Sequence, residues 1–248
     1  MYQVIQMISL KKIIPYFIIF IVAVVLVFVG TENDDVAVQS SGDIRPVIII
    51  DAGHGGIDGG AVASDGTQEQ YINLDIARKI NEYLSELGYV TIMTRTDDNS
   101  IHDPDAETIR QKKVSDIHNR LKIIETHQDS VFVSIHLNYY TESKYNGTQV
   151  FYSPNNANSG KLAQYIQSSV VSLLQPDNTR QIKQSDSSIY LLYHSPVPSV
   201  MVECGFLSNA EETEKLKNEN YRTQMAEAIC KGIIDYLNSA ENESAVSN

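Results

Sequence analysis

Cysteine is scarce in this chain of 248 residues, which contains only Cys204 and Cys230. Two cysteines are too few for a disulfide framework, and they lack the pair spacing of a cysteine zinc site. One bridge between them could form, but buried free thiols are the commoner state. We therefore expect both thiols to be free.

Basic residues are also few, with 19 lysines and arginines against 31 acidic residues and a formal net charge of −12. This balance argues against DNA or RNA as a partner, because phosphates call for a basic surface. It argues equally against a folded face that lies on anionic lipid. Internal repeats are missing from the sequence as well, which excludes solenoids and arrays of repeated wall-binding modules.

One long apolar run stands near the amino terminus, at residues 13–29, "IIPYFIIFIVAVVLVFV". Its 17 residues are the lower limit for a membrane-spanning helix, and the preceding Lys11 and Lys12 favour a cytoplasmic start. A cleaved signal peptide is the alternative, but "VFVG" lacks the small residues of a cleavage site. We predict that residues 1–30 form an uncleaved membrane anchor. Either reading places the folded part outside the cytoplasm.

Two polar segments flank the body of the chain. Residues 31–45, "TENDDVAVQSSGDIR", and residues 240–248 are polar and lack periodicity, which is typical of a linker and a tail. Residues 46–239 are left as one domain of ordinary size, large enough to bury its own core.

The body alternates between strand and helix patterns. Apolar, β-branched runs predict strands at 47–50, 89–94, 131–136, 148–152 and 199–203. Apolar residues at helical spacing predict helices at 69–87, 114–125, 162–174 and 221–237. This alternation is typical of an α/β fold with a mainly parallel, twisted sheet flanked by helices.

Three of the predicted strands lead to residues that can bind metal or transfer protons: His54, His136 and Glu203. Ligands of open α/β sheets bind beyond the carboxyl ends of the strands, and Glu69 opens a helix at the same edge. Taken singly, each residue has an ordinary explanation as a capped polar group or a helix-start acid. Glu203 is harder to explain in this way, because an unpaired buried carboxylate costs several kcal/mol. Two histidines and one carboxylate match the ligand set of catalytic zinc sites.

Five blocks of sequence, in order between residues 46 and 238, resemble the zinc-dependent N-acetylmuramoyl-L-alanine amidases of the amidase_3 family. The blocks are "VIIIDAGHGGIDGGAV", "GTQEQYINLDIARKI", "TRTDD", "NRLKIIETHQDSVFVSIHLN" and "PSVMVECGFLSNAEE". The resemblance implies that His54, Glu69 and His136 bind one zinc ion and that Glu203 is the catalytic residue. Departures from the family pattern are small, as with Ala52 in place of proline, and none removes a ligand.

The resemblance also implies the reaction, which is hydrolysis of the amide between N-acetylmuramic acid and the L-alanine of the stem peptide. In this chemistry zinc activates a water molecule, and Glu203 would take the water proton and return it to the leaving amine. Arg95, Arg120, Asn73 and Asn138 also lie in or beside the matching blocks. Each could contact substrate or have a structural role, so the substrate-binding residues stay unassigned.

The gaps between the blocks are short, and neither tail contains a wall-binding module or an inhibitory helix. This organisation resembles the germination-specific amidases, which are single anchored domains acting on spore cortex, where the stripped muramic acid becomes muramic-δ-lactam. The resemblance implies an extracytoplasmic enzyme, in the forespore intermembrane space in that setting. Restraint of the enzyme would then come from its place, its timing or a partner. As a further hypothesis, we expect an accessory protein that activates the enzyme by helping it to hold its zinc.

Two other classes of function remain as alternatives. A catalytically inactive peptidoglycan-binding module would have lost a ligand or Glu203, and all four residues are present. A cysteine amidase would use Cys204, but a reactive thiol is expected at a helix start beside a base. Cys204 instead follows a strand glutamate, and strand alternation turns the two side chains to opposite faces.

Overall fold

The computed structural model describes residues 46–246, with side chains to residue 241. The predicted anchor at 1–30 and linker at 31–45 lie outside the described residues. Within residues 46–246, no helix is both long and apolar enough to cross a membrane. Residues 46–246 belong to one compact unit.

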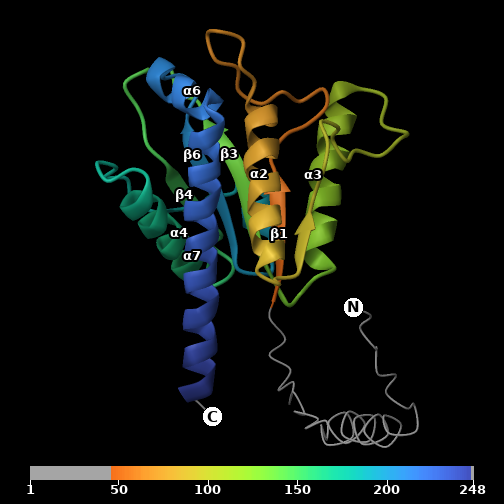
Figure 1. The fold of residues 1–248 in the computed structure, drawn as a ribbon. Helices are drawn as coiled ribbons and strands as arrows, with labels where there is room; N and C mark the ends of the chain where they lie inside the picture. Colours follow the sequence, from red (N-terminus) through yellow and green to blue (C-terminus); the bar gives the residue numbers. More distant parts are fainter. Residues whose placement is uncertain (1–45, 247–248) are drawn as a thin grey trace, which may run out of the picture. The chain divides into compact units, whose positions relative to one another are not determined.

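A six-stranded sheet forms the centre of this unit (Figure 1), in the order β2-β1-β3-β6-β4-β5. The strands are β1 (Val47–Ala52), β2 (Thr91–Met93), β3 (Ser130–Asn138), β4 (Gln149–Tyr152), β5 (Lys183–Gln184) and β6 (Ser199–Phe206). Four of the five strand pairings are parallel, and β4 runs antiparallel to β6. The predicted α/β fold with a mainly parallel sheet is therefore confirmed.

Helices cover both faces of the sheet. One face packs against α2 (Glu69–Glu86), α4 (Ser159–Leu173) and α7 (Glu219–Val246), and the other against α3 (Ile109–Glu125) and α5 (Tyr190–His194). Strand β1 shows why its sequence is continuously apolar: Ile48 and Ile50 face the first layer, Ile49 faces the second, and all three are fully buried.

The predicted helices were placed correctly, although their ends differ. Helix α3 begins at Ile109 and not at residue 114, because Thr108 and Gln111 form a capping box that satisfies its first turn. Helix α2 ends before Gly88, whose φ of +80° terminates the helix in the left-handed region. The short elements α5, α6 (Ala210–Lys217) and β5 were not predicted, since they are too short to show a period.

The carboxyl-terminal segment differs from the expected tail. Helix α7 continues to Val246, so residues 240–246 extend the predicted helix and are not an irregular tail. The segment contains no glycine or proline that would stop a helix, and Ala240 and Glu241 have high helix propensity.

Candidate metal centre and active site

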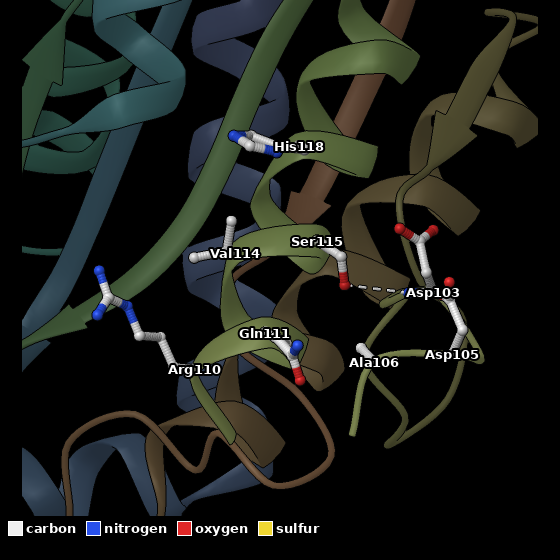
Figure 2. A pocket seen from close by; sticks show the side chains of 8 residues that line it. All are labelled: Asp103, Asp105, Ala106, Arg110, Gln111, Val114, Ser115 and His118. Carbon is white, nitrogen blue, oxygen red and sulfur yellow. Dashed lines mark hydrogen bonds between the residues drawn. The ribbon is translucent and has the colours of Figure 1, made fainter. Parts of the chain in front are cut away.

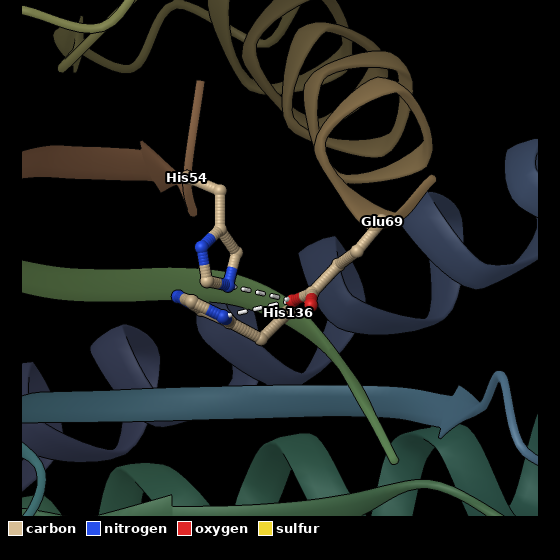
Figure 3. Close-up of side chains that lie close together, drawn as sticks. All are labelled: His54, Glu69 and His136. Carbon is tan, nitrogen blue, oxygen red and sulfur yellow. Dashed lines mark hydrogen bonds and ion pairs between the residues drawn. The ribbon is translucent and has the colours of Figure 1, made fainter. Parts of the chain in front are cut away.

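The structure brings His54, Glu69 and His136 together at the carboxyl edge of the sheet (Figure 3). His54 lies in the loop after β1, Glu69 is the first residue of α2, and His136 lies near the end of β3. Their candidate ligand atoms all lie within 4.8 Å of one another. Oε1 of Glu69 is 3.3 Å from Nε2 of His54 and 3.0 Å from Nδ1 of His136.

This donor set fits a zinc ion. Two ligand atoms bound to one tetrahedral zinc at about 2.0–2.1 Å would lie about 3.3–3.4 Å apart, close to the separations observed here. Two imidazoles and one carboxylate leave the fourth position open, as in catalytic zinc sites. Among the described residues, His54, Glu69 and His136 form the one group of histidines, cysteines or acids placed closely enough to hold a metal ion.

Glu69 is fixed by backbone and side-chain donors from three segments. Its Oε2 accepts a hydrogen bond from the Ala61 N–H at 2.8 Å, and its Oε1 accepts from the Leu137 N–H at 3.0 Å and from Asn73 at 3.1 Å. The residue is only 3% exposed. Burial alone would raise the pKa of Glu69, but hydrogen bonds from His136 and His54 outweigh it and hold the pKa below its usual range. Glu69 is therefore an anionic group in a fixed position.

His54 is oriented by a residue that the sequence did not single out. Nδ1 of His54 lies 2.9 Å from Asp58, which in turn forms an ion pair with Lys113 at 2.8 Å. This contact turns Nε2 toward Glu69, as carboxylates commonly do for metal-binding histidines. Burial alone would lower the pKa of His54, but the contacts with Asp58 and Glu69 raise it to about 9. The only sequence signal for Asp58 is its place four residues after His54 in a glycine-rich loop.

Glu203 lies directly beside the three candidate ligands. In the parallel pairing of β3 and β6, Glu203 is the partner of His136, so the two side chains project from the same face. The residue as a whole is partly exposed, but its Oε2 is buried and has no hydrogen-bond partner among the described residues. Burial raises the pKa of Glu203 to about 7, with opposing effects from His136 and Glu69. Its carboxyl group is thus suited to exchange a proton near neutral pH.

Two buried arginines hold the loop that carries His54. Arg95 donates to the carbonyl oxygens of Ala52 and Gly53, and Arg120 donates to those of Ala52 and His54. Both arginines are 3% exposed. Their contacts are therefore structural, and the same holds for Asn73, which is fully buried and binds Glu69 and the Gly53 carbonyl.

The cysteines take no part in this centre. Cys204 and Cys230 are free and buried, as expected. Burial raises the pKa of the Cys204 thiol well above its usual value, and nearby Glu203 and Glu69 add to the effect. Cys204 packs in the apolar core together with Val202, on the face opposite to Glu203. A thiolate nucleophile at this position is disfavoured.

A separate cavity of about 480 Å³ lies over the first turns of α3 (Figure 2). Its lining includes Asp103, Arg110, Val114 and His118, and none of the four predicted site residues. The ring of His118 lies 5.6 Å from the ring of Tyr190. The cavity is distinct from the histidine–glutamate cluster.

Comparison with known proteins agrees with this geometry. Residues 48–235 match the family model described as N-acetylmuramoyl-L-alanine amidase, Amidase_3. A relative from Bacillus subtilis, the germination-specific N-acetylmuramoyl-L-alanine amidase, is 35% identical over 191 residues, covering 77% of this chain and 79% of the relative.

Solved structures give the same result. The CwlD amidase from Clostridioides difficile, solved in complex with the GerS lipoprotein, is 42% identical with a TM-score of 0.75, covering 78% of this chain and 99% of that one. The amidase AmiC2 of Nostoc punctiforme is 28% identical with a TM-score of 0.67, covering 78% of this chain and 98% of that one. The chain described here belongs to the Amidase_3 family of N-acetylmuramoyl-L-alanine amidases.

Proposed function

We propose that this chain hydrolyses the amide bond between N-acetylmuramic acid and the L-alanine of the peptidoglycan stem peptide. His54, Glu69 and His136 would hold one zinc ion, and Glu203 would transfer the proton. The observation that carries the proposal is the buried, unpartnered Oε2 of Glu203 beside a fixed His–Glu–His cluster. A buried polar atom without a partner is costly unless a ligand or water completes it.

The residues divide the work of amide hydrolysis between them. In such a site, zinc supplies the Lewis acidity that makes water nucleophilic near neutral pH and stabilises negative charge on the carbonyl oxygen. Glu203 accepts the proton of the attacking water and then donates it to the leaving amine, which otherwise departs poorly. The burial of Glu203 acts to raise its pKa above the usual carboxyl range, which suits both transfers. Asp58 and Asn73 keep His54 and Glu69 in position.

Replacing Glu203 with glutamine tests its role. The variant should keep the zinc content of the unmodified chain, measured by elemental analysis under the same conditions, and lose activity on peptidoglycan by about 10²- to 10⁴-fold, because the amide cannot transfer the proton. Glu211→Gln, which removes an exposed carboxylate from the start of α6, is the matched control and should keep activity. Loss of zinc together with activity would show that Glu203 is a ligand and not the base.

We further propose that the enzyme acts outside the cytoplasm, held by residues 1–30, and that its substrate is spore cortex. The likeness to a germination-specific amidase supports this role. In a spore-forming host, deletion of the gene should remove muramic-δ-lactam from the cortex muropeptides, as measured by mass spectrometry. Normal muramic-δ-lactam in the mutant would contradict the cortex role.

An accessory protein is the third part of the proposal. The CwlD structure was solved with a lipoprotein, and we propose that a comparable partner helps this chain to hold its zinc. The fragment 31–248 should then bind zinc weakly and turn over slowly until the partner is added. Full zinc content and full turnover by the fragment alone would contradict this part.

A further inference from the structure

Three residues form a row across the sheet at the site. His136 on β3 pairs with Glu203 on β6, and Glu203 pairs in turn with Gln149 on β4. Residues directly opposite one another share a face, so all three side chains project toward the same side. Neighbouring strands are about 4.8 Å apart, which places Gln149 about 5 Å from Glu203 along the row.

The side-chain amide of Gln149 connects this row to Arg180. Its Oε1 accepts a hydrogen bond from Nη1 of Arg180 at 3.2 Å, and its Nε2 donates to the carbonyl oxygen of Gln181 at 2.9 Å. Nε of Arg180 donates to the Asn146 carbonyl oxygen at 2.7 Å. The guanidinium carbon also lies 4.5 Å from the centre of the Phe206 ring. These contacts fix the position and the plane of the guanidinium group.

The contacts that hold Arg180 are nevertheless neutral. They are a carbonyl oxygen, an amide oxygen and two aromatic rings, those of Phe206 and Tyr145. Among residues 46–241, no carboxylate lies within ion-pair distance of Arg180. The charge of Arg180 acts to lower the pKa of Glu212, but the Oε2 of Glu212 accepts hydrogen bonds from the backbone N–H groups of Gly147 and Phe206. A guanidinium has five N–H donors, and the two hydrogen bonds described leave three available.

Arg180 therefore differs from Arg95 and Arg120, the two arginines of the His54 loop. Arg95 also has no carboxylate within ion-pair distance among the described residues, but it is only 3% exposed and donates to four backbone carbonyl oxygens. Arg120 is paired with Asp51 and Asp116, and Arg222 on α7 is paired with Asp75. Arg180 is only partly buried, and its charge is held in a fixed orientation beside the row that contains Glu203. A planar guanidinium presented in this way is suited to bind a carboxylate through two parallel hydrogen bonds.

The spacing fits the substrate class of the proposed function, on which this inference rests. Glu203 must reach the scissile amide, and two residues of extended peptide span about 7 Å. A carboxylate on the second residue of the stem peptide would thus reach about one strand beyond Glu203, where Gln149 and Arg180 lie. We propose that Arg180, oriented by Gln149, binds the free carboxylate of the second stem-peptide residue and selects for it.

The experiment uses two synthetic N-acetylmuramoyl peptides that differ only at the second residue, which has a free carboxylate in one and a carboxamide in the other. The full chain should cleave the carboxylate form with a kcat/KM about 10- to 100-fold higher, as expected for a charge-assisted bidentate contact. Arg180→Gln should remove this preference by slowing the carboxylate form alone. Arg180→Lys should keep part of it, because the charge remains while the planar fork is lost.

Binding provides a readout that is independent of turnover. In a Glu203→Gln background, the Kd values of the two peptides should differ by the same factor, and Arg180→Gln should make them equal. Lys183→Gln is the control, since it removes an exposed cation on the adjacent strand β5. That variant should leave the preference unchanged.

The possible outcomes separate the two proposals. The inference would be overturned if the unmodified chain cleaved both peptides with the same kcat/KM. It would also be overturned if Arg180→Gln, with normal zinc content, lowered kcat/KM equally for both peptides, and Arg180 would then have a structural role. Discrimination in binding without any cleavage of either peptide would support Arg180 while contradicting the proposed reaction.

Discussion

At the scale of single residues, Gly53 shows how little space surrounds His136. A Cβ atom at this position would lie 2.2 Å from Nε2 of His136, far inside contact distance. Gly53→Ala should therefore displace the imidazole and lower zinc affinity by about 10- to 100-fold, the range known for disturbed ligand orientation. Zinc titration against a competing chelator would measure this change.

The control for this variant is Gly160→Ala. Gly160 lies in the first turn of α4, and its added Cβ would come no closer than 3.6 Å to Tyr152. The change should leave zinc affinity unaltered and favour the helix by about 0.5–1 kcal/mol. Normal zinc affinity in Gly53→Ala would show that His136 is not held where the structure places it or does not bind metal.

The two thiols give a second prediction at this scale. Cys204 and Cys230 are fully buried, and burial raises the pKa of both. Iodoacetamide should therefore react with neither thiol in the folded protein, and Cys204→Ala should keep amidase activity. Mass spectrometry before and after urea denaturation measures the labelling, and activity lost with labelling of Cys204 would revive the cysteine mechanism.

Much of the site could be predicted from residue types at the ends of strands. His136 and Glu203 follow apolar runs, and the parallel sheet places both at one edge. Asp58 and Arg180 could not be found in this way, because their roles depend on loop conformation and on long-range pairing with His54 and Gln149. Arg95 and Arg120 were noticed, but sequence alone did not decide between substrate contact and support of the loop.

At the scale of elements, a buried ion pair joins β1 to α3. Asp51 and Arg120 are 1% and 3% exposed, and Asp51 also accepts hydrogen bonds from Thr94 and Ser134. Arg120→Met should lower the free energy of unfolding by about 3–5 kcal/mol, because it leaves a buried carboxylate without its partner. Urea denaturation measures the loss. The exposed pair of Lys231 and Asp235 is the control, and Lys231→Met should change stability by less than about 1 kcal/mol.

The same pair predicts a pH dependence. Burial alone would raise the pKa of Asp51, but Arg120 and the two hydroxyl groups outweigh it and lower the pKa to about 2. A depressed carboxyl pKa adds stability that is complete above the unfolded pKa of about 4 and is lost as the pH falls through about 2. Asp51→Asn should remove about 2 kcal/mol of that acid-dependent stability. Urea curves between pH 5 and pH 2 that have the same pH dependence in both proteins would contradict this.

Long periodic elements were predictable, and their boundaries were less so. The apolar stripe of α2 and the runs of β1 and β3 predicted the elements that carry the three candidate ligands. Strand β6 extends to Phe206, three residues beyond the predicted end, because pairing with β3 continues past Glu203. Helix α6 depends on the Asn209 cap and on tertiary contacts of buried Glu212, which hydropathy does not report.

At the scale of the whole molecule, the fold should not depend on the metal. The sheet is covered by apolar layers on both faces, and Glu69 remains hydrogen-bonded to Ala61 and Leu137 through the backbone. A chelator should therefore abolish amidase activity while the circular dichroism spectrum stays that of a folded protein. This differs from small zinc domains, which unfold without metal. Unfolding on chelation would assign the metal a structural role, and activity that survives complete metal removal would contradict the proposed chemistry.

The anchoring of Glu69 also has an evolutionary consequence. This side chain joins the loop before α2, the end of β3 and Asn73, so its loss would harm the fold as well as any metal site. His54 lies in a partly exposed loop, and among the described residues its side chain has polar contacts only with Asp58 and Glu69, beside an edge-to-face contact with the ring of His136. A lineage that abandoned hydrolysis and kept only wall binding would therefore be expected to lose His54 early and to retain Glu69. Proteins that retain the glutamate at position 69 and lack the histidine at position 54 would be identified as members of such a lineage.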